Sequence, residues 1–259
     1  MACIRCVVSQ PVFKSPEERI EEVRDLIADR GAVRIDELAR DFGVSEMTIR
    51  RDLDELEALG LARRVRGGAI ATGPEPWERR HQHNARAKAK IAEKLLPMVP
   101  TVGTIAFDAS TTIYRLAASI SNVRDLVVVT NGWDTFYSLK ATPGVTAFLT
   151  GGTEEPRTGS LVGPMASRAA QSFFYDTFFA SAAALDLDGG PSEAALAESE
   201  VKRAFSQTSN RIVLAVDQSK LETRATARVL GFESIDVLVT DLDPLDSRLD
   251  VYRDVVEIA

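Results

Sequence analysis

The stretch at residues 44–56 reads VSEMTIRRDLDEL, and it decides how the N-terminal part of the chain folds. Ser45 is a favourable N-cap, because its hydroxyl can accept a hydrogen bond from a backbone N–H that has no partner inside the helix. Apolar residues follow at spacings of four, three and three, at Ile49, Leu53, Leu56 and Leu59. This spacing predicts an amphipathic helix with one buried stripe and a polar outward face.

The residues on either side of this helix complete a recognisable pattern. Residues 35–42 form a shorter amphipathic pattern, and Gly43 supplies a tight turn between the two helices. A short helix, a glycine turn and a second helix with a polar start are typical of a helix-turn-helix. Residues 61–70 then form two strand-like runs around Gly67-Gly68, which is the composition of a β-hairpin wing. The sequence therefore predicts a winged helix-turn-helix.

Charge is unevenly distributed along the chain. The formal net charge of -7 at first argues against a nucleic-acid partner. Distribution matters more than the total, however, and residues 60–90 contain eight cations against two anions. Three of these cations lie on the predicted wing, at Arg63, Arg64 and Arg66. We therefore expect the wing to contact phosphates of DNA.

Composition excludes several other classes of protein. No run of about 18 apolar residues is present, so we expect no membrane span. The N-terminal segment is too short for a signal peptide, and the chain is expected to be cytoplasmic. Cys3 and Cys6 have the spacing of half a zinc site, but no second Cys/His pair lies nearby. We therefore expect no metal site.

Strands and helices alternate in the C-terminal part of the chain. Runs rich in β-branched residues, such as 126–130 and 212–216, predict strands that are buried on both faces. Alternation with helices predicts a mostly parallel, Rossmann-like α/β domain. The predicted segments are an unstructured N-terminus (1–14), the winged helix-turn-helix (15–71), a linker rich in proline and glycine (72–83) and the α/β domain (84–259).

Ligands of open α/β sheets bind at the carboxyl ends of the strands, and the loop 108–112 lies at such an end. It joins a strand to a helix, so free backbone N–H groups and its hydroxyls could converge on a phosphate. The alternative is simple helix capping by Ser110 or Thr111. Glu198 and Lys202 lie one helical turn apart, and their alternative is a surface ion pair.

The separated residues together resemble a known family. Residues 48–53, Leu56, Gly60 and 64–69 resemble the winged helix-turn-helix of the DeoR family of bacterial transcription regulators. From about Lys90 to Asp241 the chain resembles the sensor domain of that family, which is similar in fold to ribose-5-phosphate isomerase. The matching pieces of this second part are Asp108, 111–112, 129–131, 149–152, Gly163, Asp186, Glu198, Lys202, Asp217, 219–220 and 240–241.

The resemblance implies a repressor of a carbohydrate utilisation operon that is released when a phosphorylated sugar binds. It implies a double-stranded DNA operator bound by a homodimer or homotetramer, and no cofactor, metal or catalytic residue. The residues expected to contact DNA are Ser45, Thr48, Arg50, Arg51, Arg63, Arg64 and Arg66. The residues expected to bind the effector are Asp108, Ser110, Thr111, Thr112, Asn131, Gly151, Gly152, Asp186, Glu198, Lys202, Asp217 and Lys220.

Within that set, the loop 108–112 and Lys220 are expected to bind the phosphate, whereas Asn131, Gly152, Glu198 and Lys202 would face the sugar. Two segments depart from the family pattern. Ala109-Ser110 stands where the family usually has a glycine pair, and residues 190–193 read GPSE in place of Gly-Leu-Thr-Thr. These departures favour an unusual effector.

Two other functions fit parts of the sequence. A sugar-phosphate isomerase with an appended winged helix could use a catalytic base from Asp108, Asp186, Glu198 or Asp217. The fold cannot decide between catalysis and sensing. The predicted DNA-contact residues favour the regulator, because an enzyme has no use for them. The arginines of the wing also disfavour a winged helix that binds only protein.

Overall fold

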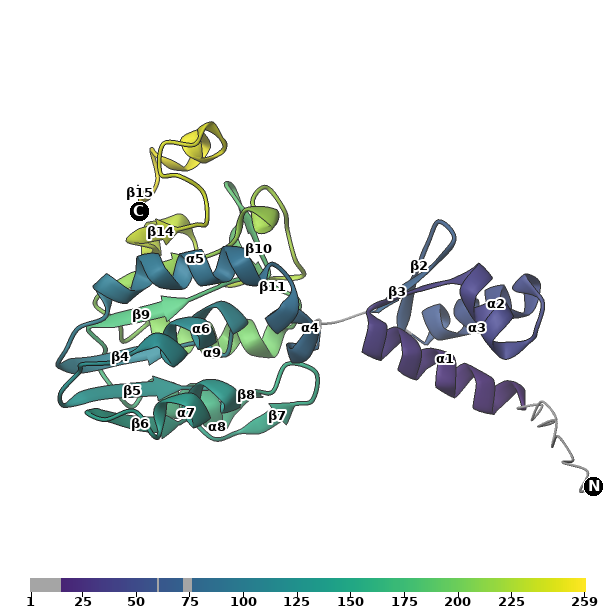
Figure 1. Cartoon of the computed structure of the whole chain (residues 1–259), viewed down its shortest axis with the longest axis horizontal. Helices are drawn as coiled ribbons and strands as arrows, with labels where there is room; N and C mark the ends of the chain where they lie inside the picture. The colour runs from purple at the N-terminus through teal and green to yellow at the C-terminus, as the bar shows by residue number, and fades with distance from the viewer. Residues whose placement is uncertain (1–14, 60, 72–75) are drawn as a thin grey trace, which may run out of the picture. The chain divides into compact units, whose positions relative to one another are not determined.

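The computed structural model describes residues 15–59, 61–71 and 76–259, which form two compact units (Figure 1). The predicted unstructured segment 1–14, including Cys3 and Cys6, lies outside the described residues. No helix in the described ranges is both long enough and apolar enough to cross a bilayer.

The first unit is a winged helix-turn-helix, as the sequence predicts. Its sheet has three strands in the order β1-β3-β2, with both pairs antiparallel. Gly43 ends the second helix in the left-handed conformation, with φ 64°. The elements of this unit are α1 (Pro16–Arg30), β1 (Ala32–Arg34), α2 (Ile35–Phe42), α3 (Glu46–Ala58), β2 (Ala62–Val65) and β3 (Gly68–Ala71).

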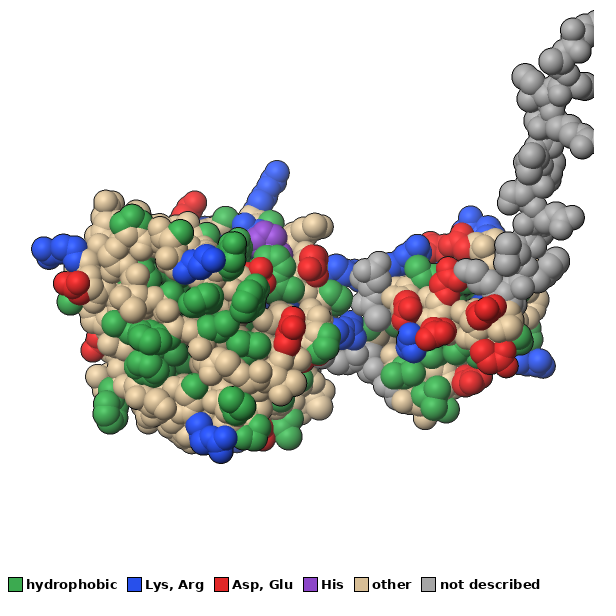
Figure 2. Space-filling view, turned by 90° about the horizontal axis from the view of Figure 1, so that it is seen from below, with side chains coloured by type: hydrophobic (Ala, Val, Ile, Leu, Met, Phe, Trp, Pro, Cys, Tyr) green, Lys and Arg blue, Asp and Glu red, His purple; other side chains and the backbone are tan. Residues whose placement is uncertain are grey.

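A single apolar core and one buried ion pair hold this unit together. The core includes Ile49, Leu53 and Leu56, which is the stripe that the sequence predicts for α3. Asp52 lies on the same helix, and its two oxygens accept hydrogen bonds from the guanidinium of Arg19 at 2.7 and 3.0 Å. This pair joins α1 to α3, the helix that the helix-turn-helix pattern places in DNA. Acidic side chains of α1 gather on one face of the unit (Figure 2).

The second unit is a three-layer α/β domain around a seven-stranded parallel sheet, in the order β15-β14-β12-β9-β4-β5-β6. The fold class predicted from the sequence is therefore confirmed. The strands of this sheet are β4 (Gly103–Phe107), β5 (Leu126–Thr130), β6 (Val145–Leu149), β9 (Thr177–Ala180), β12 (Ile212–Ala215), β14 (Val237–Val239) and β15 (Glu257–Ile258).

Helices cover both faces of the sheet. On one face, residues of α5 (Ala85–Leu95), α6 (Thr111–Ser119) and α7 (Trp133–Leu139) share a core with β4, β5 and β12. On the other face, α8 (Pro164–Ala170) and α9 (Leu196–Ser206) pack over β9 and β5. Short 3-10 helices lie at η1 (Leu96–Met98), η2 (Gln218–Lys220), η3 (Phe232–Ser234) and η4 (Ser247–Tyr252).

Two small sheets lie outside the main sheet, and the sequence does not predict them. One is the antiparallel pair β7 (Thr153–Glu155) and β8 (Ser160–Val162). The other joins β10 (Ala184–Asp186), β11 (Gly190–Glu193) and β13 (Ala227–Arg228). Strands of two to four residues are too short to show an alternating pattern, so their pairing is decided by tertiary contacts.

The predicted linker differs from the structure over part of its length. Residues 77–82 form the helix α4 (Trp77–Gln82), which belongs to the second unit. The Trp77 ring stacks on His81 with centroids 4.7 Å apart, and both rings meet Tyr114 of α6 edge-on. A helix of six residues is not stable alone. The aromatic packing therefore explains why α4 forms within the predicted linker.

Candidate effector site and DNA interface

A pocket of about 150 Å³ opens in the second unit at the carboxyl ends of the parallel strands. Its walls come from α4, α5, the β4–α6 loop, the end of β5, β11, α9 and η2. The polar and charged residues that line it are Arg80, His83, Asn84, Lys88, Ser110, Thr111, Asn131, Glu193, Glu198, Lys202, Asp217, Ser219 and Lys220.

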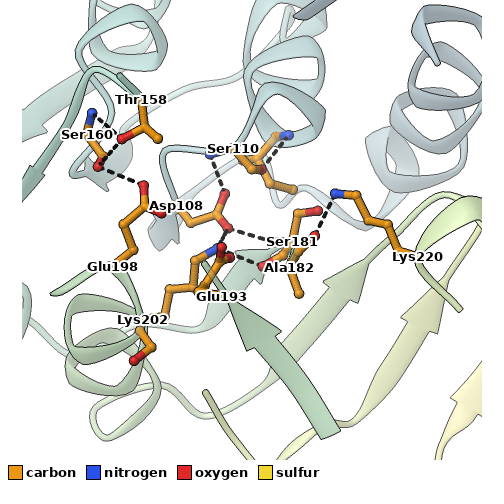
Figure 3. Close-up of polar contacts among 12 residues, drawn as sticks. Asp108, Ser110, Thr158, Ser160, Ser181, Ala182, Glu193, Glu198, Lys202 and Lys220 are labelled. Carbon is orange, nitrogen blue, oxygen red and sulfur yellow. Dashed lines mark hydrogen bonds and ion pairs between the residues drawn. The ribbon is translucent and has the colours of Figure 1, made fainter. Parts of the chain in front are cut away.

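Lys202 lines this pocket, and its ammonium is bonded to three oxygen atoms of the protein (Figure 3). Its Nζ lies 2.5 Å from Asp108 Oδ2 and 2.9 Å from Glu193 Oε1, and it donates to the Ser181 carbonyl at 2.7 Å. Burial alone would lower the pKa of Lys202, but the two carboxylates outweigh it and raise the pKa. Lys202 is therefore a charged structural residue with all three N–H donors occupied.

One end of the pocket is cationic. Lys220 Nζ donates to the Ala182 carbonyl at 2.6 Å, and Lys88 Nζ donates to the carbonyls of Arg80 and His83. Burial, followed by repulsion from Lys220, lowers the pKa of Lys88 to about 8. Burial likewise lowers the pKa of Lys220. Two ammonium groups that are held in poor solvation form a site that an anion would stabilise.

Asn84 and Asp217 connect this end to α5 and η2. Asp217 Oδ1 accepts hydrogen bonds from Asn84 Nδ2 at 2.9 Å and from the backbone N–H of Ser219 at 3.1 Å. Burial alone would raise the pKa of Asp217, but the Ser219 hydrogen bonds and Lys220 outweigh it and lower the pKa. Asp217 is therefore an ionised residue that orients the cationic end.

The opposite end is acidic. Glu198 Oε1 accepts a hydrogen bond from the Ser160 hydroxyl at 2.9 Å, and Ser160 in turn lies 2.8 Å from the Thr158 hydroxyl (Figure 3). Burial, followed by repulsion from Glu193, raises the pKa of Glu198. Asn131 Nδ2 donates to the Leu161 carbonyl at 3.1 Å, whereas its Oδ1 is buried and has no hydrogen-bond partner among the described residues.

The loop 108–112 combines the two roles that the sequence leaves open. Ser110 is the N-cap of α6, because its hydroxyl accepts a hydrogen bond from the Ile113 N–H at 3.2 Å. Asp108 accepts from the N–H groups of Ser110 at 2.9 Å and Ser181 at 2.7 Å. Thr111 donates to the Arg80 carbonyl at 3.3 Å. The loop is thus a capped helix start, and Ser110 and Thr111 still line the pocket.

The structure brings most of the predicted effector residues together. The pocket lining includes Ser110, Thr111, Asn131, Glu198, Lys202, Asp217 and Lys220, and Asp108 is bonded to Lys202 beneath it. Besides Asp108, four predicted residues are not part of the lining: Thr112, Gly151, Gly152 and Asp186. Asp186 instead lies 2.5 Å from Arg224, and a Cβ at Gly152 would meet the Val162 carbonyl.

Six polar or charged lining residues lie outside the predicted set: Arg80, His83, Asn84, Lys88, Glu193 and Ser219. The cations among them do have a sequence signal, since Arg80 and Lys88 belong to the basic stretch 60–90. Of this stretch, only the wing arginines are predicted to contact DNA. The structure divides it between the wing and the pocket.

The predicted DNA-contact residues lie on α3 and the wing. Ser45 caps α3, and its hydroxyl lies 2.9 Å from that of Thr48. Arg50 and Arg51 are exposed, and Arg50 has only a 3.4 Å ion pair with Glu46. On the wing, the side chains of Arg63 and Arg66 are exposed.

Arg64 differs from its two neighbours on the wing. Its Nε lies 3.5 Å from Asp54 of α3, and its backbone N–H donates to the carboxylate of Glu57 at 2.7 Å. Its guanidinium is half-buried. Arg64 therefore joins the wing to α3, and it is less available to a phosphate than Arg63 or Arg66.

Comparison with known proteins matches both units to one family. The model of the DeoR-like helix-turn-helix domain matches residues 19–74, and the model of the DeoR C terminal sensor domain matches residues 83–242. The HTH-type transcriptional regulator GolR of Listeria innocua is 31% identical over 87% of this chain and 91% of its own length. The glycerol-3-phosphate regulon repressor of Escherichia coli is 30% identical over 92% and 95%.

More distant similarity links the chain to solved structures. Ribose 5-phosphate isomerase A from Methanocaldococcus jannaschii has a TM-score of 0.38 and 13% identity, covering 53% of this chain and 55% of that one. The beta subunit of eIF2B from Chaetomium thermophilum has a TM-score of 0.44 and 14% identity, covering 66% and 54%.

A winged helix-turn-helix followed by an α/β domain with a polar pocket, together with relatives that are regulators, defines a DNA-binding transcription regulator rather than an enzyme. The chain belongs to the DeoR family.

Proposed function

We propose that this regulator represses a carbohydrate utilisation operon and leaves its operator when a phosphorylated sugar binds the pocket. The observation that carries the proposal is the cationic end, where Lys88 and Lys220 lie close to the start of α6. Two ammonium groups and a helix N-terminus favour a phosphate. The similarity to the Escherichia coli glycerol-3-phosphate regulon repressor supports the proposal, because the name of that relative refers to a phosphorylated compound. A DNA target implies a cytoplasmic location.

Removal of Lys220 tests the proposed phosphate site. In a thermal-shift screen of phosphorylated sugars and polyols, with the free sugars as controls, we expect only phosphorylated compounds to raise the melting temperature. Lys220→Ala should raise the dissociation constant of the best compound about ten- to a hundredfold, because a charged hydrogen bond is lost. Lys140→Ala removes an exposed lysine outside the pocket and serves as the control. Equal affinities in the two variants would contradict the assignment.

Lys88 provides a further prediction, because its pKa is lowered to about 8. A lysine with this pKa is charged at pH 7 and mostly neutral at pH 9, whereas a phosphate is a dianion at both values. Asp217 and the cations Lys220, Arg80 and Arg115 surround it and contribute to the shift. Effector affinity, measured by calorimetry, should therefore fall about tenfold from pH 7 to pH 9.

Lys88→Met is the control for this pH dependence. It should bind the effector more weakly at pH 7 and lose the tenfold decrease, because the titrating group is gone. The same decrease in the variant and in the wild-type protein would assign the titration to another group.

Lys88 also suggests how binding reaches the DNA-binding unit. Its ammonium donates to carbonyls at the C-terminal end of α4, and α4 is the first helix after the wing along the chain. A phosphate in the pocket would compete for that ammonium and weaken its hydrogen bonds to the carbonyls at the end of α4. An effector shifts a regulator between two states only through such a difference in contacts.

We propose that α3 lies in the major groove and that a homodimer or homotetramer binds paired half-sites, because one winged helix has a small footprint. Self-association is supported by large apolar side chains that are exposed around the edge strand β6, namely Trp133, Tyr137 and Phe148. Figure 2, which is seen from below relative to Figure 1, shows several apolar side chains on the surface of the second unit. An unprotected edge strand with apolar neighbours is typical of an interface.

The wing arginines give a prediction on the salt dependence of operator binding. Changing Arg63 and Arg66 together to Ala should reduce the slope of log K against log salt by about 2, because each neutralised phosphate contributes about 0.9. Arg64→Ala should change the slope less, since Arg64 is tied to Asp54. Fluorescence anisotropy at several salt concentrations measures the slope. An unaltered slope in the double variant would mean that the wing does not contact DNA.

A further inference from the structure

The acidic end of the pocket holds more carboxylates than cations. Asp108 and Glu193 share one ammonium, that of Lys202, at 2.5 and 2.9 Å (Figure 3). Glu198 adds a third carboxylate, and all of these side chains are nine-tenths or more buried. A buried carboxylate without a compensating cation is strongly unfavourable. Three buried carboxylates therefore lie at this end beside one bonded ammonium, so negative charge is in excess there.

Glu198 has a neutral partner and no cationic one. Its hydrogen-bond donor is the Ser160 hydroxyl at 2.9 Å. In the described part of the chain, no ion pair within 4.0 Å reaches its carboxylate. The guanidinium of Arg80 donates to the Thr158 carbonyl, and its charge reaches Glu198 without forming an ion pair, so it offsets only part of the rise in the Glu198 pKa. Burial and Glu193 raise the pKa of Glu198, which is the response of a carboxylate that lacks a counter-ion.

A second and independent observation comes from Asn131. It is 3% exposed and lines the same pocket, and its Nδ2 is occupied by the Leu161 carbonyl. In the part of the chain that the structure describes, its Oδ1 is buried without a hydrogen-bond partner. An acceptor of this kind is available to a donor from a ligand in the pocket. Asn131, Glu193 and Glu198 thus face the pocket with acceptors and need both N–H or O–H donors and positive charge.

We propose that the effector carries a protonated amine on its sugar part, in addition to its phosphate, and that Glu193 and Glu198 select this amine. An ammonium group has three donors and one positive charge, which matches the three acceptors and reduces the excess of negative charge. No group of three or more His, Cys, Asp or Glu side chains in the described residues could hold a metal ion, so the charge is assigned to the ligand.

Glu193 is a feature of this chain's own sequence. It lies in residues 190–193, where GPSE replaces the Gly-Leu-Thr-Thr typical of the family. β11 carries it into the pocket beside Lys202. A threonine there would leave Lys202 and Asp108 as a neutral pair, whereas Glu193 makes the end acidic. The inference rests on the proposed function, since it adds an amine to a ligand whose phosphate binds at Lys88 and Lys220.

The test compares matched ligands on the full-length protein. Calorimetry should be run with 2-amino-2-deoxyglucose 6-phosphate and its galactose epimer, together with the parent hexose 6-phosphates and the N-acetylated forms. Acetylation keeps the nitrogen but removes its charge. The free amine of at least one epimer should bind about ten- to a hundredfold more tightly than its parent sugar and its acetylated form. Equal affinities across both series would overturn the inference.

Variants identify the selecting residues. Glu193→Gln and Glu198→Gln keep the shape of each side chain and remove its charge, and each should reduce the preference for the amine about tenfold or more. Glu200→Gln, at an exposed position of the same helix as Glu198, should leave the preference unchanged. A preference that survives both pocket substitutions would overturn the assignment. The wild-type comparison of ligands remains decisive if a variant fails to fold.

Inorganic phosphate separates this inference from the proposed function. If phosphate stabilises the protein in a Lys220-dependent manner but amines have no advantage, the phosphate site stands and the amine proposal fails. If phosphate and every phosphorylated sugar fail to bind, the proposed function fails, and the amine proposal fails with it.

Discussion

Replacement of Lys202 by Met is expected to lower the free energy of unfolding of the second unit by about 3–5 kcal/mol, because it breaks a buried ion pair from one side. The side chain of Lys202 is 8% exposed, and its ammonium is bonded to Asp108, Glu193 and the Ser181 carbonyl. Methionine fills a similar volume, so the change isolates the charge. Two carboxylates would then be left buried without a cation, which costs far more than the pair itself contributes.

Tryptophan fluorescence can measure this effect in the intact protein. Both tryptophans, Trp77 and Trp133, belong to the second unit, so a urea titration followed by their emission reports this unit alone. Glu200→Gln on the same helix is the control and should stay within about 0.5 kcal/mol of the wild-type value. A Lys202→Met transition at the wild-type midpoint would show that the carboxylates find other partners.

A double variant adds a second check. Asp108→Asn combined with Lys202→Met removes both charges of the 2.5 Å pair. Its destabilisation should be smaller than the sum of the two single changes, because Glu193 is then the one carboxylate of the pair that is left without Lys202. Strict additivity would mean that Asp108 and Lys202 act independently.

Asp52→Ala is expected to destabilise the winged helix-turn-helix by about 3 kcal/mol for the same physical reason. The guanidinium of Arg19 meets both oxygens of Asp52 at 2.7 and 3.0 Å, and the two side chains are 11% and 5% exposed. Loss of the carboxylate leaves Arg19 charged and poorly solvated between α1 and α3. The helix α3, which we propose lies in the major groove, then loses its connection to α1. Operator binding should therefore weaken although no proposed DNA-contact residue has changed.

Hydrogen exchange followed by mass spectrometry can localise this effect. Peptides from α1 and α3 should exchange faster in Asp52→Ala, whereas peptides from the second unit should be unchanged. Glu55→Ala, three residues along the same helix, is the matched control, because Glu55 is exposed. Wild-type exchange of α1 and α3 in Asp52→Ala would rule out a stabilising role for the ion pair.

Local signals in the sequence were sufficient for most of the elements. The Ser45 cap, the stripe on α3 and Gly43 act within one or two turns of the chain, and all three are found in the structure. The strand at 126–130 begins and ends as predicted, and the strand predicted at 212–216 ends one residue earlier, because β-branched runs buried on both faces leave little choice. The position of the pocket followed from the carboxyl ends of these strands.

Contacts between distant residues were decided only by the tertiary structure. Lys202 is predicted to face a sugar, but α9 packs against β9 and β11, and Asp108 and Glu193 occupy the donors of its ammonium. The basic residue Arg80 reaches the pocket because α4 packs on Tyr114 through Trp77, and Lys88 lines the pocket from α5. Sequence periodicity reports which face of an element is buried, whereas the partner of a buried charge depends on which elements meet there. The sequence by itself therefore determined the family, the two units and the edge of the sheet that binds the ligand, and the packing of the elements decided which charges remain free to bind it.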